Sequence, residues 1–216
     1  MARPRRPLLT RDRIIETALA LIDAEGLAAV STRRLATELG VQGPSLYNHV
    51  RTKDDLIDAV VDAVLGEVEI SMFAGLSAEN PDWRRSLGDW ARSYRTAMAA
   101  HPHIVPALAG GPRHRPNALR MADAVFGGLV AAGWPRREAT TVGTTMRYFL
   151  TGASLGSFAA GFPSDVAVYA DAYPHLNEAH LLAERQQRID RDAFEVGLES
   201  LLDGLESRYR LLVGGV

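Results

Sequence analysis

The feature that most constrains this 216-residue chain is the short interval from Gly40 to Pro44, which separates two short amphipathic stretches. The first stretch starts at Ser31, a residue type that favours helix N-caps, and Gly40 is suited to end it. The second has Pro44 in its first turn, where the missing N–H costs nothing, and runs to Val50. Two helices this close in sequence must meet at a sharp angle with Val41 packed between them, which predicts a helix-turn-helix.

Helical periodicity also dominates outside this unit, and no alternating strand pattern competes with it. Apolar residues recur on one face after Thr10, a suitable N-cap, and stop at Gly26. Thr52 and Asp55 resemble a capping box at the start of a linker helix that we expect over about 52–70. Further helices are predicted at about 82–100, 117–133, 136–161 and 191–212, while 161–190 is too polar and irregular to assign. The expected fold class is all-α.

Charge is distributed unevenly between the two parts of the chain. Residues 1–53 carry nine Lys or Arg against five acidic residues, a formal charge of +4. Because the whole chain has a charge of -2, the remaining residues have a charge of -6. This asymmetry suits a small phosphate-binding head on an acidic body, although a charge of +4 is modest. We therefore expect a helix-turn-helix head that could bind DNA over 1–53 and a separate helical body over 54–216.

Composition narrows the remaining possibilities. The chain has no cysteine, which excludes disulfides, thiol nucleophiles and zinc sites that contain cysteine. No apolar stretch follows the N-terminal arginines that could serve as a signal peptide or membrane span, so we expect a cytoplasmic protein.

The candidate DNA-contacting residues cluster around the second helix of the helix-turn-helix. Its N-terminal end enters the major groove in such units, and Gly43, Pro44 and Ser45 are small enough for close approach to base edges. Ser45 and Gln42 both donate and accept hydrogen bonds. Side chains that could reach flanking phosphates follow at Tyr47, Asn48, His49 and Lys53, the last being the only lysine of the chain.

From periodicity alone, the same pattern also fits proteins that never bind DNA. Tyr47 could be a core aromatic residue and His49 a capping or surface histidine. The arginines at 3, 5 and 6 could form either a solvated tail or an arm in the minor groove.

The chain resembles the TetR family of bacterial repressors in four stretches: STRRLA at 31–36, GV at 40–41, PSLYNHV at 44–50 and KDDL at 53–56. The body resembles the tetracycline-repressor branch around 82–84, 101–102, 116–119 and 194–205. The resemblance implies a three-helix head, a linker helix and a body that dimerises through two late helices, for which 136–161 and 191–212 are our candidates.

The resemblance also implies roles for individual residues. It places Thr32 and Arg33 at the start of the second helix, Gly43, Pro44 and Ser45 against bases, and Tyr47, His49 and Lys53 on phosphates. Asn48 stands where family members often carry a bulkier aromatic residue or histidine, which leaves its role open between a base contact, a phosphate contact and none.

TetR-like bodies enclose a small molecule whose binding changes the spacing of the two heads. Large, soft apolar residues are the candidates for the pocket lining, with ordinary core packing as the alternative for each of them. They are Trp90, Tyr94, Met98, Ile104, Leu108, Met121, Val125, Met146, Phe149 and Phe158.

Tetracycline itself is not the expected effector. The polar groups that hold this drug and its magnesium ion in the family align approximately with Glu69, Trp90, Ala107, Gly110, Tyr148 and Gly156. Without a polar cage, a chelated dication lacks ligands to replace its water, so the resemblance implies a more apolar effector.

Other functions find less support in the sequence. His101 and His103 flank Pro102 with no neighbouring acid or cysteine, so we expect neither a metal site nor a cofactor. No spacing of Ser, His, Asp and Glu suggests an enzyme. The leading hypothesis is a ligand-responsive regulator that binds a palindromic operator as a homodimer and represses. The alternatives are an architectural protein without sequence specificity and a helical enzyme.

Overall fold

The computed structural model describes residues 9–110, 115–169 and 172–213, and all regular structure within these ranges is helical. The α-helices are α1 Arg11–Glu25, α2 Thr32–Leu39, α3 Gly43–Tyr47, α4 Lys53–Leu65, α5 Trp83–Ala100, α6 Pro116–Ala131, α7 Arg136–Ser154 and α8 Gln186–Val213. Six 3-10 segments join them: η1 Leu27–Ala29, η2 Ser71–Phe73, η3 Pro102–Gly110, η4 Ala159–Gly161, η5 Val166–Val168 and η6 Ala179–Leu181. The predicted all-α class is confirmed.

Local capping sets the helix starts in the head. The hydroxyls of Thr10, Ser31 and Thr52 accept hydrogen bonds from backbone N–H groups three residues later, at 3.2, 3.2 and 3.0 Å. Each bond satisfies one of the orphan donors of a first helical turn. Gly26 and Gly40 end α1 and α2 with φ of +84° and +66°, a region where side chains with a Cβ are strained.

Three helices end earlier than their apolar periodicity predicts. The third ends at Tyr47 instead of Val50, and the Leu46 carbonyl accepts the N–H groups of both His49 and Val50 beyond that end, at 2.9 and 3.0 Å. The linker helix ends at Leu65 instead of about 70, and Val68 is buried outside it. The helix predicted over 136–161 ends at Ser154, close to Gly156 with its φ of +141°.

A tertiary contact is made at the end of α4. The side-chain amide of Asn117 donates to the carbonyl of Asp62 at 2.8 Å and so caps the last turn. A Cβ on Gly66 would lie 2.7 Å from that amide nitrogen, so a larger residue at 66 would displace the Asn117 side chain. The last turn of the linker helix is thus in direct contact with the body.

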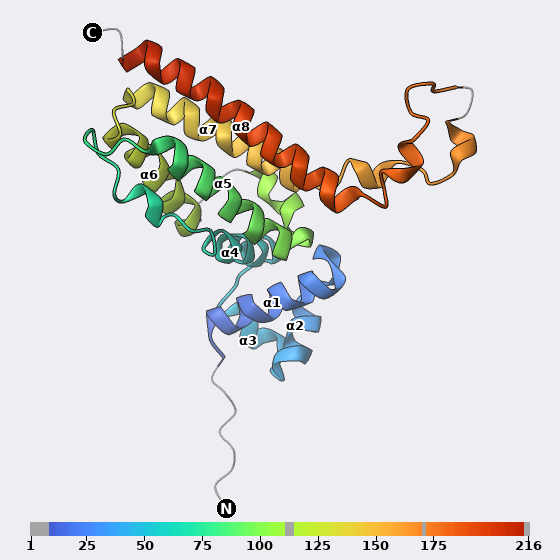
Figure 1. Ribbon diagram of the computed structural model, residues 1–216. Helices are drawn as coiled ribbons and strands as arrows, with labels where there is room; N and C mark the ends of the chain where they lie inside the picture. The colour runs from blue at the N-terminus through green and yellow to red at the C-terminus, as the bar shows by residue number, and fades with distance from the viewer. Residues whose placement is uncertain (1–8, 111–114, 170–171, 214–216) are drawn as a thin grey trace, which may run out of the picture.

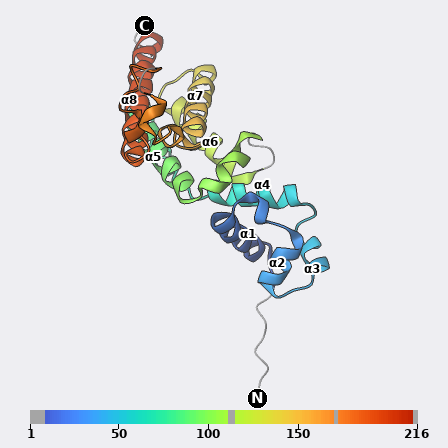
Figure 2. The same ribbon diagram turned by 90° about the vertical axis from the view of Figure 1, so that its right-hand side faces the viewer.

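The helices form a small head and a layered body joined by α4 (Figures 1 and 2). Helices α1, α2 and α3 pack around Ile14, Leu35 and Leu46, each at most 4% exposed. In the body, α5 contacts α4, α6, α7 and α8, and its Leu87 and Tyr94 are fully buried. Among the described helices, none is long and apolar enough to cross a membrane.

Ion pairs fasten the long helix α8 to α5. Arg84 contacts Glu199 at 2.8 Å and Asp203 at 2.7 Å, and Arg92 contacts Glu195 at 2.8 Å. Isolated exposed pairs contribute little, but a network of this kind fixes the register of the two helices. The outer face of α8 therefore has a defined orientation.

The segment between α7 and α8 extends from one end of the body as an arm (Figure 1). We call its described residues, 155–169 and 172–185, the arm. It carries large apolar side chains with high exposure, namely Phe158 at 83%, Val166 at 54%, Tyr173 at 52% and Leu176 at 37%.

Candidate DNA-recognition head and effector pocket

The turn between α2 and α3 is built by backbone geometry. Gly40 takes the left-handed conformation, and the N–H of Val41 donates to the carbonyl of Ala36 at 2.9 Å. The Val41 side chain is half-buried against the core of the head. This is the sharp helix-turn-helix that the spacing predicts.

The N-terminal end of α3 lies at the surface of the head. Gln42 and Pro44 are exposed, and Gly43 and Ser45 are half-buried. Apart from its sequence neighbours and the backbone of α3, no described atom lies within 4 Å of a Cβ placed on Gly43, so no other segment of the described chain packs against this position. The four predicted base-contacting residues therefore share one accessible surface.

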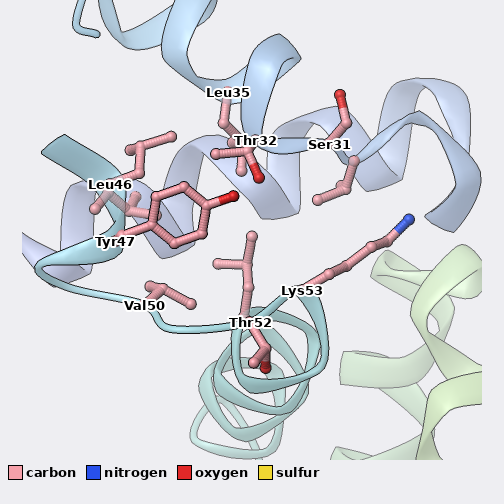
Figure 3. A pocket seen from close by; sticks show the side chains of 11 residues that line it. Ser31, Thr32, Leu35, Leu46, Tyr47, Val50, Thr52 and Lys53 are labelled. Atoms are coloured by element: carbon pink, nitrogen blue, oxygen red, sulfur yellow. The ribbon is translucent and has the colours of Figure 1, made fainter. Parts of the chain in front are cut away.

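Tyr47, Lys53 and Thr32 come from three different helices and meet around a cavity of about 30 Å³ (Figure 3). Tyr47 is 55% exposed, and its hydroxyl points toward Thr32. Lys53 extends from the start of α4 and makes no ion pair with any described residue. A hydroxyl and an unpaired ammonium beside a helix N-terminus make a suitable phosphate-binding surface.

The remaining predicted contacts lie at the edges of this surface. Asn48 and His49 are exposed in the turn after α3, and Arg33 is exposed in the first turn of α2. Arg33 has no ion-pair partner in the described chain, whereas its neighbour Arg34 contacts Glu25 at 3.0 Å and Glu38 at 3.1 Å. The N-terminal arginines 3, 5 and 6 lie outside the described residues.

The body contains a mostly apolar cavity of about 600 Å³ between α5, α6, η3 and α7, a size typical of small-molecule sites. Four of the predicted lining residues face it: Trp90, Leu108, Met121 and Val125. The rest of the lining comes from Ala118, Ala122, Phe126, Gly143, Thr144, Arg147, Tyr148, Thr151, Gly152 and Leu155.

The other six candidates lie away from the cavity lining. Tyr94, Met98, Ile104 and Met146 are core residues with at most 2% exposure. Phe149 stacks on Phe194 of α8 with ring centroids 5.5 Å apart. Phe158 lies in the arm, 5.2 Å from the ring of Phe162. Hydrophobicity alone does not separate a core residue from a cavity residue.

Most of the polar lining was not predicted: Thr144, Arg147 and Thr151 were not among the candidates, and Tyr148 entered only through its alignment with a tetracycline-binding position. The four residues follow the i, i+3, i+4, i+7 spacing of one helical face, which was the available signal. Arg147 also lies over the ring of Tyr94, with 5.1 Å between its Cζ and the centroid. Burial raises the pKa of Tyr94, and the positive charge of Arg147 opposes that rise. Tyr94 therefore stays a neutral phenol at physiological pH.

Glu69, which aligns approximately with a tetracycline-binding position, has another role here. Its carboxylate accepts the N–H groups of Ile70 and Ser71 at 2.9 and 2.8 Å, and these bonds lower its pKa, with Ser71 contributing most. The carboxylate thus holds the turn into η2 and is absent from the cavity lining.

Two histidines join the body to the head. His101 lies between Asp23, at 2.8 Å, and Glu67, at 3.3 Å, and the ring of His103 lies 2.9 Å from the carbonyl of Ile22. The residues next to His101 in sequence include no acid, but the fold brings Asp23 and Glu67 from distant segments to its ring. Within the described residues, no group of three or more His, Cys, Asp or Glu is arranged to hold a metal ion.

Comparison with known proteins matches both parts of the chain. Residues 14–60 match the family model for bacterial regulatory proteins of the tetR family, and residues 76–209 match the tetracyclin repressor-like C-terminal domain. An HTH-type transcriptional regulator from Saccharopolyspora erythraea is 34% identical over 148 residues, which are 68% of this chain and 61% of that relative. The class A tetracycline repressor protein from transposon 1721 of Escherichia coli is 35% identical, covering 94% of this chain and 93% of the repressor.

A solved structure supports the same relationship. The Streptomyces coelicolor TetR family protein ActR, in complex with actinorhodin, is 30% identical and superimposes with a TM-score of 0.73. The match covers 94% of this chain and 99% of ActR.

Proposed function

This chain belongs to the TetR family of bacterial regulatory proteins, a non-enzymatic family, and from that premise we propose that it is a ligand-released repressor. In this proposal two copies of the chain bind a palindromic operator, and a small-molecule effector in each body releases them. The observation that carries the proposal is the accessible N-terminal end of α3, flanked by Tyr47 and by Lys53, which makes no ion pair within the described part of the chain.

We assign DNA recognition to the head, residues 1–53, and effector binding and dimerisation to 54–216. Gln42, Gly43, Pro44 and Ser45 face the bases, because they share the accessible end of α3. Phosphates are bound by Thr32, Arg33, Tyr47, His49 and Lys53, with Asn48 at the edge of the same surface.

The outer face of α8 supports the homodimer. One row of exposed residues along α8, spaced three or four apart, consists only of small or apolar uncharged residues. They are Ala193, Val196, Ser200, Gly204, Ser207 and Leu211. We call this set the α8 stripe. Small side chains allow two helices to approach closely, and uncharged ones avoid the desolvation cost of burial. The exposed apolar residues of the arm would find cover against the second copy.

The cavity in the body supports an effector site. Tetracycline repressors and the complex of ActR with actinorhodin are among the related proteins, and the cavity is large enough for a drug-sized molecule. Its α6 wall is tied to the linker helix, because Asp62 of α4 accepts the backbone N–H of Asn117 at 2.9 Å. A shift of α6 on ligand binding would therefore move α4 and the head.

Fluorescence anisotropy with the DNA upstream of the gene tests the proposal. We expect binding to this duplex to exceed binding to a scrambled duplex by about a thousandfold at physiological salt, and to weaken steeply as salt rises. Equal affinity for both duplexes would overturn the proposal and would favour an architectural protein without sequence specificity.

A further inference from the structure

The lining of the body cavity contains one charged side chain, Arg147 of α7. Its guanidinium makes no ion pair and no hydrogen bond with any described residue, and it lies over the face of the Tyr94 ring, 5.1 Å from the centroid. No Asp or Glu belongs to the cavity lining. A half-buried arginine at an apolar cavity thus lacks a counter-charge from the described protein.

A hydroxyl near Arg147 adds a second hydrogen-bond donor to the cavity lining. Thr140, Thr141 and Thr145 of the same helix each donate to the carbonyl four residues earlier, at 3.2, 3.1 and 2.9 Å. Thr144, which lines the cavity, makes no such bond within the described chain. Its hydroxyl is one helical turn from Arg147, so both offer donors on one face of α7.

The other walls of the cavity are apolar. Helix α6 contributes Met121, Val125 and Phe126, and α5 and η3 contribute Trp90 and Leu108. A bound molecule would therefore meet aromatic and aliphatic surface on one side and hydrogen-bond donors with a positive charge on the other. Neither a neutral hydrocarbon nor a cation would use that second wall.

We propose that the effector is an aromatic or polycyclic acid whose ionised group pairs with Arg147 while its ring system packs against α5 and α6. This inference rests on the proposed effector site and revises the apolar effector expected from the sequence, because Arg147 adds a charged group to the lining. Arginine keeps its charge throughout the physiological pH range, so the selection for an anion does not depend on the ionisation of the protein.

A pair of dyes with a common skeleton tests the charge preference. Anilinonaphthalene sulfonate carries a permanent negative charge, and N-phenylnaphthylamine is the same skeleton without the sulfonate. Both become fluorescent in apolar sites, so titration of the full-length protein gives a Kd for each. We expect the sulfonate to bind at least about tenfold more tightly, although the neutral dye is the more hydrophobic of the two.

Three variants locate this preference. Arg147→Met should abolish the preference and Arg147→Lys should retain part of it, whereas Arg137→Met, an exposed arginine on the same helix, should leave it unchanged. Ala122→Trp fills the cavity and should weaken both dyes. Thermal unfolding followed by circular dichroism checks that each variant folds.

The outcomes separate this inference from the proposed function. Equal binding of the two dyes in the cavity, or a preference that survives Arg147→Met, would overturn the acidic effector and leave the effector site in place. If Ala122→Trp changed neither dye, the cavity would not be a ligand site, and both the inference and the effector part of the proposed function would fail.

Discussion

Tyr47 is the residue on which the assignment of the phosphate-binding surface can be tested most directly. Its ring lines the small cavity of the head, and its hydroxyl is available to a partner because the side chain is 55% exposed. We expect Tyr47→Phe to lose one hydrogen bond per head, about 1 kcal/mol each. Two heads on one operator would then lose roughly thirtyfold in affinity.

Anisotropy on the upstream duplex measures this loss, and sedimentation velocity shows whether the dimer is retained. Tyr47→Ala should weaken binding further because the ring is also removed. Thr37→Ala, an exposed hydroxyl on α2 outside the predicted set, serves as the control. Wild-type affinity in both Tyr47 variants would remove this residue from the DNA-contacting set.

The sequence was most informative about residues whose role is local. Thr10, Ser31 and Thr52 were recognised as caps because a cap bonds to the chain three residues away. Arg147 was not predicted as a binding residue, because its role depends on the other segments of the cavity lining. These segments, in α5, η3 and α6, contribute no Asp or Glu to the lining. Local chemistry is visible in one sequence, whereas a missing counter-charge becomes visible only when the fold is assembled.

At the scale of elements, Gly40 forms the turn that sets the direction of α3 relative to α2. It has a φ of +66°, and nothing lies within 4 Å of a Cβ placed on it, so the cost of Gly40→Ala is conformational alone. We expect a loss of about 1 kcal/mol in the free energy of unfolding. Urea unfolding of the full-length protein measures it.

Gly43→Ala is the matched control because Gly43 has equal space for a Cβ and no positive φ. It should unfold at or slightly above the wild-type urea concentration, since alanine favours the helix. The same midpoint for both variants would show that the backbone conformation of Gly40 does not stabilise the turn.

The ends of α4 and α7 and the start of α8 show why helix boundaries were predicted less well than the helices themselves; α8 begins at Gln186 instead of about 191. Apolar periodicity continues through Val68, which is buried although the helix has already ended. Asn117 of α6, more than fifty residues away in sequence, donates to the Asp62 carbonyl in the last turn of α4. No pattern within 52–70 carries that information.

At the scale of the whole molecule, the proposed homodimer would depend on the α8 stripe. Gly204 lies near its middle, and a Cβ there meets nothing within 4 Å in its own chain. Gly204→Arg therefore leaves the protomer unstrained and even favours the helix, by up to about 1 kcal/mol. Across a close helix contact, however, the same side chain would bury an unpaired charge, at a cost of several kcal/mol.

We expect Gly204→Arg to sediment as a folded monomer and to lose specific operator binding, because one head contacts only half of a palindrome. Gly127→Arg is the matched control, since Gly127 is exposed on α6 with equal space around it and lies outside the stripe. A Gly204→Arg protein that remains dimeric and binds like the control would place the subunit interface elsewhere. Loss of operator binding in a variant that stays dimeric would instead show that the stripe sets the spacing of the heads without holding the subunits together.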